Sequence, residues 1–234
     1  MVLCSPLEFE ASFLAARKKA SNESRAMASD KLFQRLGWMT RQPPVMLSDT
    51  RMALGLYSDV FDCSLMAFTG DWGKTWQFGK PMVFATPRNI QPSLVRKRNG
   101  DIAAFMRAPL HIRRAESRDG GMTWTEAACD IANPGSSVAC TALRSGRWVL
   151  VCNDTHSART RLTAYLSDDE GETWKWKRTI ESLQDSGSAS YPTVIQGREG
   201  EIHCVYSLKD RDQFAGSTIK HIQFNEDWVE AQDR

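Results

Sequence analysis

Apolar runs and short polar turns alternate along most of the chain, and this pattern recurs about every fifty residues. Four turn positions, Thr50, Gly100, Gly146 and Gly200, each separate two apolar runs. The runs before them read "PVML", "PSLV", "VACTAL" and "PTVI", and the runs after them read "RMALGLY", "DIAAFMR", "RWVLVCN" and "EIHCVYS". Short apolar runs between turn residues are typical of β-strands. The pattern therefore predicts four pairs of strands.

A box of the form S/T-x-D-x-G-x-T-W occurs three times, at residues 69–76, 117–124 and 167–174. Its Asp and Ser/Thr side chains can accept hydrogen bonds from nearby backbone N–H groups, and its Gly admits a left-handed turn. The Trp adds a large apolar surface that can fold back onto the sheet. We therefore expect a structural role for these residues: Asp71, Trp76, Asp119, Trp124, Asp169 and Trp174.

Each repeat adds two further strands to its pair. The third strand leads to the box ("SLMAF", "IRRAES", "LTAYLS" and "STIKHIQF"), and a fourth follows the Trp. The last repeat ends in "FNEDW", which we interpret as a degenerate box. Four strands per unit at this period are typical of propeller blades. The sequence thus predicts an all-β chain with four blades in residues 39–234.

The first 38 residues have a different pattern and are predicted to form a helical segment. Ser5 and Pro6 provide the start signals of a helix that continues through "LEFEASFLAARKKA". We interpret "SNESRAMAS" as a polar break. A second short helix is expected in "DKLFQRLGWM", capped by Ser29 or Asp30.

Composition narrows the range of functions. With 234 residues, 41% apolar and 25% charged, and a net charge of +2, the chain has no electrostatic footprint for nucleic acid. The six cysteines form no C-x-x-C pair and the four histidines show no ligand spacing, so no metal site is predicted. Cys140, Cys152 and Cys204 lie in apolar runs and are expected to be buried thiols. Without a signal peptide or membrane-spanning run, we expect the cytoplasm by default and no membrane partner.

The boxes and their flanks resemble the Asp-box, or BNR-repeat, domains of the sialidase (neuraminidase) superfamily. The segments that carry this resemblance are "GWMTRQPP", "NIQPSLV", "NPGSS", "VCND", "SYPTVIQGREGEIHCVYS" and "IKHIQFNEDW". It covers nearly all of residues 30–230 and implies a six-bladed propeller of which about four blades are present. The resemblance then implies that two blades are missing before the first repeat.

The resemblance also assigns candidate site residues. Sialidases grip the carboxylate of the sugar with three arginines, and Arg107 and Arg159 match two of them, with Arg161 as the alternative to Arg159. Tyr191 matches the tyrosine nucleophile of these glycosidases, and Gln91 stands where a glutamate should assist it. Further candidates for contact with the substrate lie at strand ends: Tyr57, Asn153 and Asp154.

Two departures leave the activity open. A glutamine cannot accept the phenol proton, and no residue matches the catalytic aspartate or the first arginine. The chain is therefore interpreted as a sialidase-like glycoside hydrolase domain acting on a terminal, anionic sugar without a cofactor. The alternatives are a non-enzymatic carbohydrate-binding propeller and a truncated fragment. Because strand edges would face the absent blades, we also expect self-association through them.

Overall fold

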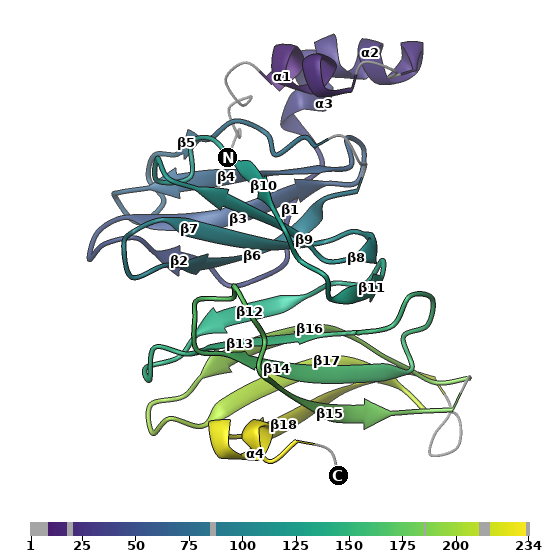
Figure 1. Ribbon diagram of the computed structural model, residues 1–234. Helices are drawn as coiled ribbons and strands as arrows, with labels where there is room; N and C mark the ends of the chain where they lie inside the picture. The colour runs from purple at the N-terminus through teal and green to yellow at the C-terminus, as the bar shows by residue number, and fades with distance from the viewer. Residues whose placement is uncertain (1–8, 18–20, 85–87, 185, 211–215, 233–234) are drawn as a thin grey trace. The chain divides into compact units, whose positions relative to one another are not determined.

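The computed structural model describes residues 9–17, 21–84, 88–184, 186–210 and 216–232. It divides into two compact units, Met1–Met106 with Arg113–Ala128, and Arg107–Ile112 with Cys129–Arg234. Each unit contains two of the four predicted repeats. We describe the units separately, and Figure 1 labels their elements. The predicted boundary between a helical segment and the blades at residues 38 and 39 stays a prediction.

The first unit begins with three short helices and contains two sheets. The helices are α1 (Phe9–Ala16), α2 (Asn22–Ser29) and α3 (Lys31–Arg35). The first sheet has the order β1 (Trp38–Thr40), β3 (Met52–Ser58), β4 (Cys63–Thr69) and β5 (Gln77–Phe78), and β2 (Val45–Met46) also pairs with β3. The second has the order β10 (Thr125–Ala127), β9 (Arg113–Ser117), β7 (Ile102–Arg107) and β6 (Ile90–Arg96). Both sheets have the strand pattern that the repeats predict.

The second unit contains the other two blades and a small two-stranded sheet. The small sheet joins β8 (Pro109–His111) to β11 (Ala132–Pro134). The third blade has the order β12 (Ala139–Ala142), β13 (Trp148–Cys152), β14 (Arg161–Ser167) and β15 (Trp176–Ser182). The last sheet has the order β16 (Ser188–Gln196), β17 (Ile202–Lys209) and β18 (Thr218–Phe224), followed by helix α4 (Glu226–Glu230). The antiparallel meander is again the one expected for propeller blades.

The three boxes form the local turns that their residues predict. In each, the Asp carboxylate accepts hydrogen bonds from the Thr two residues after the Gly, through both its backbone N–H and its hydroxyl. The leading Ser or Thr hydroxyl donates to the same carboxylate and accepts from the N–H of the Gly. Trp76 and Trp124 donate their indole N–H to the carbonyls of Gly73 and Gly121 at 3.1 Å. The structural interpretation of the box therefore agrees with its contacts.

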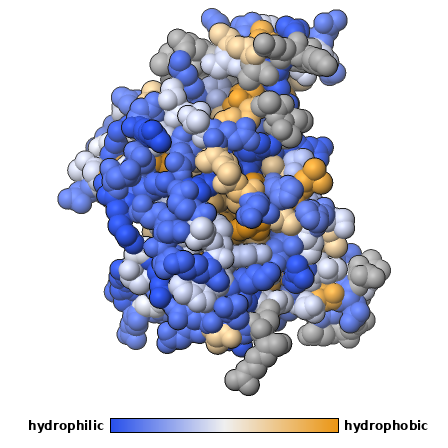
Figure 2. Space-filling model, in the orientation of Figure 1, coloured by the Kyte–Doolittle hydropathy of each residue, from blue (hydrophilic) through white to orange (hydrophobic). Residues whose placement is uncertain are grey.

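The apolar cores lie within the units, and the face seen in Figure 2 is mostly hydrophilic, with some apolar side chains exposed among the polar ones. In the first unit, β4, β6 and β7 supply buried side chains such as Phe68, Leu94 and Ile102. In the second, Val149, Leu162 and Tyr206 belong to one core cluster, against which Trp176 and Trp228 pack. The predicted burial of Cys140, Cys152 and Cys204 is confirmed, and none of the three forms a disulfide.

Two local predictions are wrong. The "SNESRAMAS" segment is not a break but helix α2, because the Ser21 hydroxyl caps it by accepting the N–H of Ser24 and Ala28 is fully buried beside Phe13 and Phe61. The "FNEDW" segment is not a degenerate box but helix α4, because the Asn225 side chain accepts the N–H of Trp228 at 2.9 Å. No fourth strand completes the last sheet among the residues that the structure describes.

The two other predictions for the amino-terminal segment have different outcomes. The predicted helix start at Ser5 and Pro6 lies outside the described residues. The second predicted helix is confirmed as α3, with Asp30 as its cap: the Asp30 carboxylate accepts the N–H groups of Leu32 and Phe33 at 2.7 and 3.3 Å.

Candidate functional site

Tyr191 has an unusual backbone conformation for a tyrosine. Its φ angle is +60°, in the left-handed region, and Pro192 follows it. The register between β16 and β17 shifts between Ser190 and Thr193, so Tyr191 and Pro192 form a bulge in an otherwise regular pair. Such a backbone costs about 1–3 kcal/mol and persists only where the surroundings fix it. Tyr191 therefore lies at a position where the strand departs from regular geometry, which is common next to functional sites.

Arg159 provides the main contact of the Tyr191 side chain. One guanidinium nitrogen donates to the phenol oxygen at 3.2 Å, and the other donates to the carbonyl of Gly135 at 3.1 Å. The guanidinium carbon also lies 5.1 Å from the centre of the tyrosine ring. Both side chains are half-buried. The Arg159 side chain is therefore held by two hydrogen bonds. Because both side chains are only half-buried, the pair remains accessible to a ligand.

The electrostatics of this pair lower the pKa of the Tyr191 phenol. Burial acts to raise the pKa of Tyr191, but the hydrogen bond and the charge of Arg159 lower it. Arg107, at the end of β7, adds a second positive charge and a hydrogen bond. The net pKa of Tyr191 lies below its ordinary value. Arg107, Arg159 and Tyr191 all belong to the second unit, and both arginines act on the Tyr191 phenol. The structure therefore brings three of the predicted site residues together.

Asn153 and Asp154 lie beside this site but are engaged internally. The Asn153 side chain is fully buried, and its amide nitrogen donates to the carbonyls of Arg161 and Ala189. The Asp154 carboxylate accepts from Arg161 at 2.6 Å and from the Tyr165 hydroxyl at 2.9 Å. Arg161, the alternative third arginine, is thus committed to Asp154, whereas Arg159 contacts Tyr191. These contacts favour structural roles, while a direct contact of Asn153 or Asp154 with substrate stays a prediction.

Tyr57 and Gln91 belong to the first unit. Tyr57 is buried near the end of β3, where it pairs with Ser64 and Met39. Gln91 lies in β6 with a φ of +58°, directly before Pro92. Its side-chain oxygen is buried and has no hydrogen-bond partner among the described residues. Gln91 therefore shares with Tyr191 a left-handed φ angle and a following proline.

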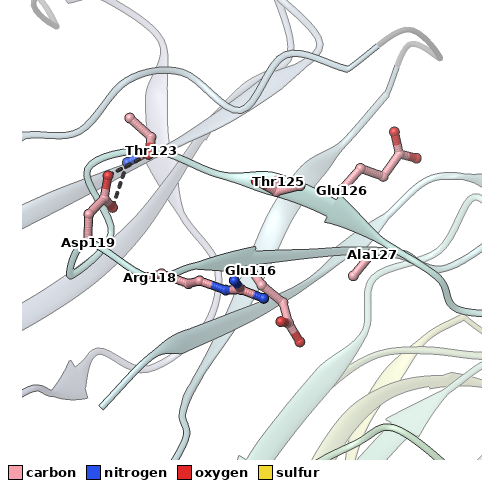
Figure 3. Close-up of a pocket in the computed structure, with 7 residues that line it drawn as sticks. All are labelled: Glu116, Arg118, Asp119, Thr123, Thr125, Glu126 and Ala127. Carbon is pink, nitrogen blue, oxygen red and sulfur yellow. Dashed lines mark hydrogen bonds between the residues drawn. The ribbon is translucent and has the colours of Figure 1, made fainter. Parts of the chain in front are cut away.

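A separate pocket of about 470 Å³ lies along the hairpin of β9 and β10. Figure 3 shows its seven lining residues, with Asp119 hydrogen-bonded to Thr123 of the second box. Glu116 is paired with Lys97 at 2.7 Å and also with Arg114. Because its carboxylates already serve the hairpin, this pocket supports a structural interpretation.

The described residues meet the requirements neither of a metal site nor of a membrane-spanning helix. Within the described ranges, no group of three or more His, Cys, Asp or Glu side chains is arranged to hold a metal ion. In the same part of the chain, no helix combines the length and the apolar character needed to cross a bilayer.

Sequence reasoning missed the carbonyl of Gly135 as a partner of Arg159. It also missed the hydrogen bonds from Asn153 to the carbonyls of Arg161 and Ala189. The segment "NPGSS" contained a signal for the role of Gly135, because a glycine in a polar loop permits the φ of +71° that this residue adopts.

Comparison with known proteins places these features in a family. The model of the BNR repeat-like domain matches residues 20–204. No curated protein sequence matches the chain.

Several solved structures match it in fold. The NanB sialidase from Streptococcus pneumoniae is 19% identical, with a TM-score of 0.70 over 86% of this chain and 33% of its own. The leech intramolecular trans-sialidase is 16% identical, with a TM-score of 0.68 over 80% of this chain and 32% of its own. A Dyadobacter fermentans protein of unknown function is 17% identical, with a TM-score of 0.66 over 81% of this chain and 54% of its own.

These matches confirm the predicted all-β fold, a propeller of sialidase type with four blades in this chain. The chain spans between about a third and about half of the length of these three structures. At identities below 20%, the likeness shows the fold alone.

Proposed function

Because the chain belongs to the family of BNR repeat-like domains, we propose that it binds a terminal, anionic sugar at Arg107, Arg159 and Tyr191 and acts on it as a sialidase-like glycoside hydrolase domain. The observation that carries the proposal is the hydrogen bond between Arg159 and the Tyr191 phenol at 3.2 Å, with Arg107 as a second charge. Guanidinium groups suit a carboxylate, and a phenol with a lowered pKa suits a nucleophile.

In the proposed reaction, the two arginines bind the sugar carboxylate and also lower the pKa of the Tyr191 phenol. The sugar carboxylate is drawn to the guanidinium groups, which brings the anomeric carbon to the phenol. The Tyr191 proton passes to solvent, and the phenolate oxygen forms a bond to the anomeric carbon. The bond to the leaving group breaks, and the leaving oxygen takes a proton from water. A second water then attacks the anomeric carbon, breaks its bond to the Tyr191 oxygen and releases the sugar, so that the phenolate is regenerated and the net reaction is hydrolysis. Gln91 accepts no proton in this scheme, so the phenol proton goes to solvent, and the lowered pKa of Tyr191 makes that loss easier.

A second candidate function is carbohydrate binding without turnover. Gln91 favours it, because a glutamine stands where the resemblance expects a glutamate and its buried oxygen has no hydrogen-bond partner among the described residues. The two functions share the arginines and differ only in whether the phenol attacks. Binding and turnover must therefore be measured separately.

The test uses a fluorogenic sialoside across pH, together with binding of a sialylated oligosaccharide followed by calorimetry. The variants are Tyr191→Phe, Arg159→Ala and, as the matched control, Tyr206→Phe, whose hydroxyl contacts Glu181 in the same unit. Loss of turnover in Tyr191→Phe alone supports the hydrolase, and saturable binding without turnover supports the second candidate.

Arg159→Ala removes a charged hydrogen-bond donor worth about 1.5–3 kcal/mol, so the Kd should rise about 10- to 100-fold in either case. A protein that neither binds nor cleaves the sugar would contradict both candidates.

We also infer self-association through the last sheet. Ile195, Val205 and Ile219 lie on one face of β16, β17 and β18, as their register shows, and they are 50%, 39% and 77% exposed. We propose that copies of the chain associate through exposed blade edges, and these exposed apolar side chains in the sheet whose edge strand is β18 support it.

The proposed compartment is a reducing one. The support for it is that none of the five cysteines among the described residues forms a disulfide.

A further inference from the structure

The side chain of Asn153 connects three segments of the second unit. Asn153 directly follows β13, and its amide nitrogen donates to the carbonyl of Arg161 at 2.7 Å and to the carbonyl of Ala189 at 2.8 Å. The backbone N–H of Ala189 in turn donates to the carbonyl of Arg159 at 2.8 Å. These bonds form a closed network that ties the segment 159–161 to strand β16. We call these four residues the amide clasp.

The residue type suits this position. A primary amide has two N–H groups on one nitrogen, whereas a serine has one donor and an ionised aspartate has none. The Asn153 oxygen has no hydrogen-bond partner in the described part of the chain, so its hydrogen bonds with described residues come from the two donors. The reversed orientation of the amide would press its oxygen against two carbonyl oxygens, which fixes the orientation given above.

The clasp holds both members of the candidate site. Arg159 belongs to it through its carbonyl, and Tyr191 follows Ala189 by two residues in the same strand. The hydrogen bond between the two side chains, at 3.2 Å, spans the segments that the clasp joins. A site of this kind works only when its groups stay within about 0.5 Å of the required geometry. A shift of either segment would therefore separate the guanidinium from the phenol.

We propose that Asn153 is a positioning residue that holds Arg159 against Tyr191, and that it does not contact the ligand. What the pair then does rests on the proposed function. The clasp itself does not, because it is defined by contacts within the chain.

The test measures the ionisation of Tyr191 by NMR of protein carrying carbon-13 in its tyrosine rings. The chain has four tyrosines, and the Tyr191→Phe variant identifies the signal. Burial raises the pKa of Tyr165 and Tyr206, so their titrations do not overlap with that of Tyr191, whose pKa is lowered. The variants are Asn153→Ala, which removes both donors, and Asn153→Ser, which keeps one hydroxyl donor. The control is Asn225→Ala, which removes an amide that caps α4 in the same unit.

We expect the midpoint of Tyr191 to move upward in Asn153→Ala and by a smaller amount in Asn153→Ser, because the phenol loses its charged donor. Asn225→Ala should lose stability without moving the midpoint. A folded Asn153→Ala protein with the unchanged midpoint would overturn the proposal.

If neither Asn153 variant folds, the unmodified protein gives the answer through its side-chain amide protons. Those of Asn153 should exchange with solvent far more slowly than the exposed amide of Asn225, and equal rates would refute the clasp. Neither measurement needs a sugar or turnover, so failure of the sugar assay and failure of this inference remain distinguishable.

Discussion

Replacing Asp169 by alanine tests whether the third box stabilises its blade. The Asp169 carboxylate accepts hydrogen bonds from the N–H of Thr173 at 2.8 Å, from the Thr173 hydroxyl at 2.5 Å and from the Ser167 hydroxyl at 2.8 Å. Asp169→Ala removes all three acceptor contacts and leaves the backbone unchanged. The turn then keeps its glycine but loses the group that closes it.

The expected loss follows from these contacts. A hydrogen bond contributes about 0.5–1.5 kcal/mol net, so three give at most about 4.5 kcal/mol. Because the carboxylate is partly exposed, water replaces some of this, and we expect a loss of about 2 kcal/mol. For a chain of 234 residues, this corresponds to a Tm lower by about 4–8 °C.

The assay is thermal unfolding followed by calorimetry and by near-ultraviolet circular dichroism. Asp168→Ala is the matched control, because Asp168 lies in the same turn and forms an exposed ion pair with Lys175 at 2.7 Å. Such exposed pairs contribute about 0–1 kcal/mol. If Asp169→Ala lowers the Tm no more than Asp168→Ala does, the box does not stabilise the blade and our reasoning about it fails.

Three further predictions concern other parts of the chain. Gly121→Ala should cost about 2–4 kcal/mol in urea unfolding, because a methyl group there meets Phe68 at 2.8 Å on a left-handed backbone, whereas Gly100→Ala meets open space and should cost about 1–2 kcal/mol. Hydrogen bonds from Thr75 and Thr69 lower the pKa of Asp71 to about 2, so its stabilisation is present above the unfolded pKa near 4 and is lost as the pH falls towards 2. In the Asp71→Asn variant, the urea concentration at the unfolding midpoint should therefore fall less between about pH 4 and pH 2 than it does in the unmodified protein. Ile219→Lys should shift light scattering towards the monomer, and an unchanged mass would contradict association through the last sheet.

The repeats and boxes could be predicted from the sequence because their causes are local. Alternating apolar residues, a Gly turn and an Asp within four residues of its partners determine each hairpin without distant contacts. Helix α2 was missed because its burial depends on Ala28 meeting Phe61, more than thirty residues away. The polar composition of its segment outweighed the capping signal of Ser21.

The candidate site depends on contacts between distant segments, which limited its prediction. The resemblance matched Tyr191 and Arg159, but the sequence could not show that Arg159 rather than Arg161 contacts the phenol. That choice follows from Asp154, whose carboxylate holds Arg161. The hydrogen bond from Asn153 to Ala189 crosses 36 residues of chain, so no local pattern signals it.

Gln91 and Tyr191 adopt the same left-handed conformation before a proline, and each precedes the glycine of its hairpin, Gly100 or Gly200, by the same number of residues. One blade places an amide side chain, and the other a phenol, at the equivalent position of its hairpin. At both positions the strand therefore fixes the backbone, and the residue type alone decides the chemistry of the side chain. The two blades therefore carry side chains of different chemistry on nearly the same backbone φ, +58° for Gln91 and +60° for Tyr191.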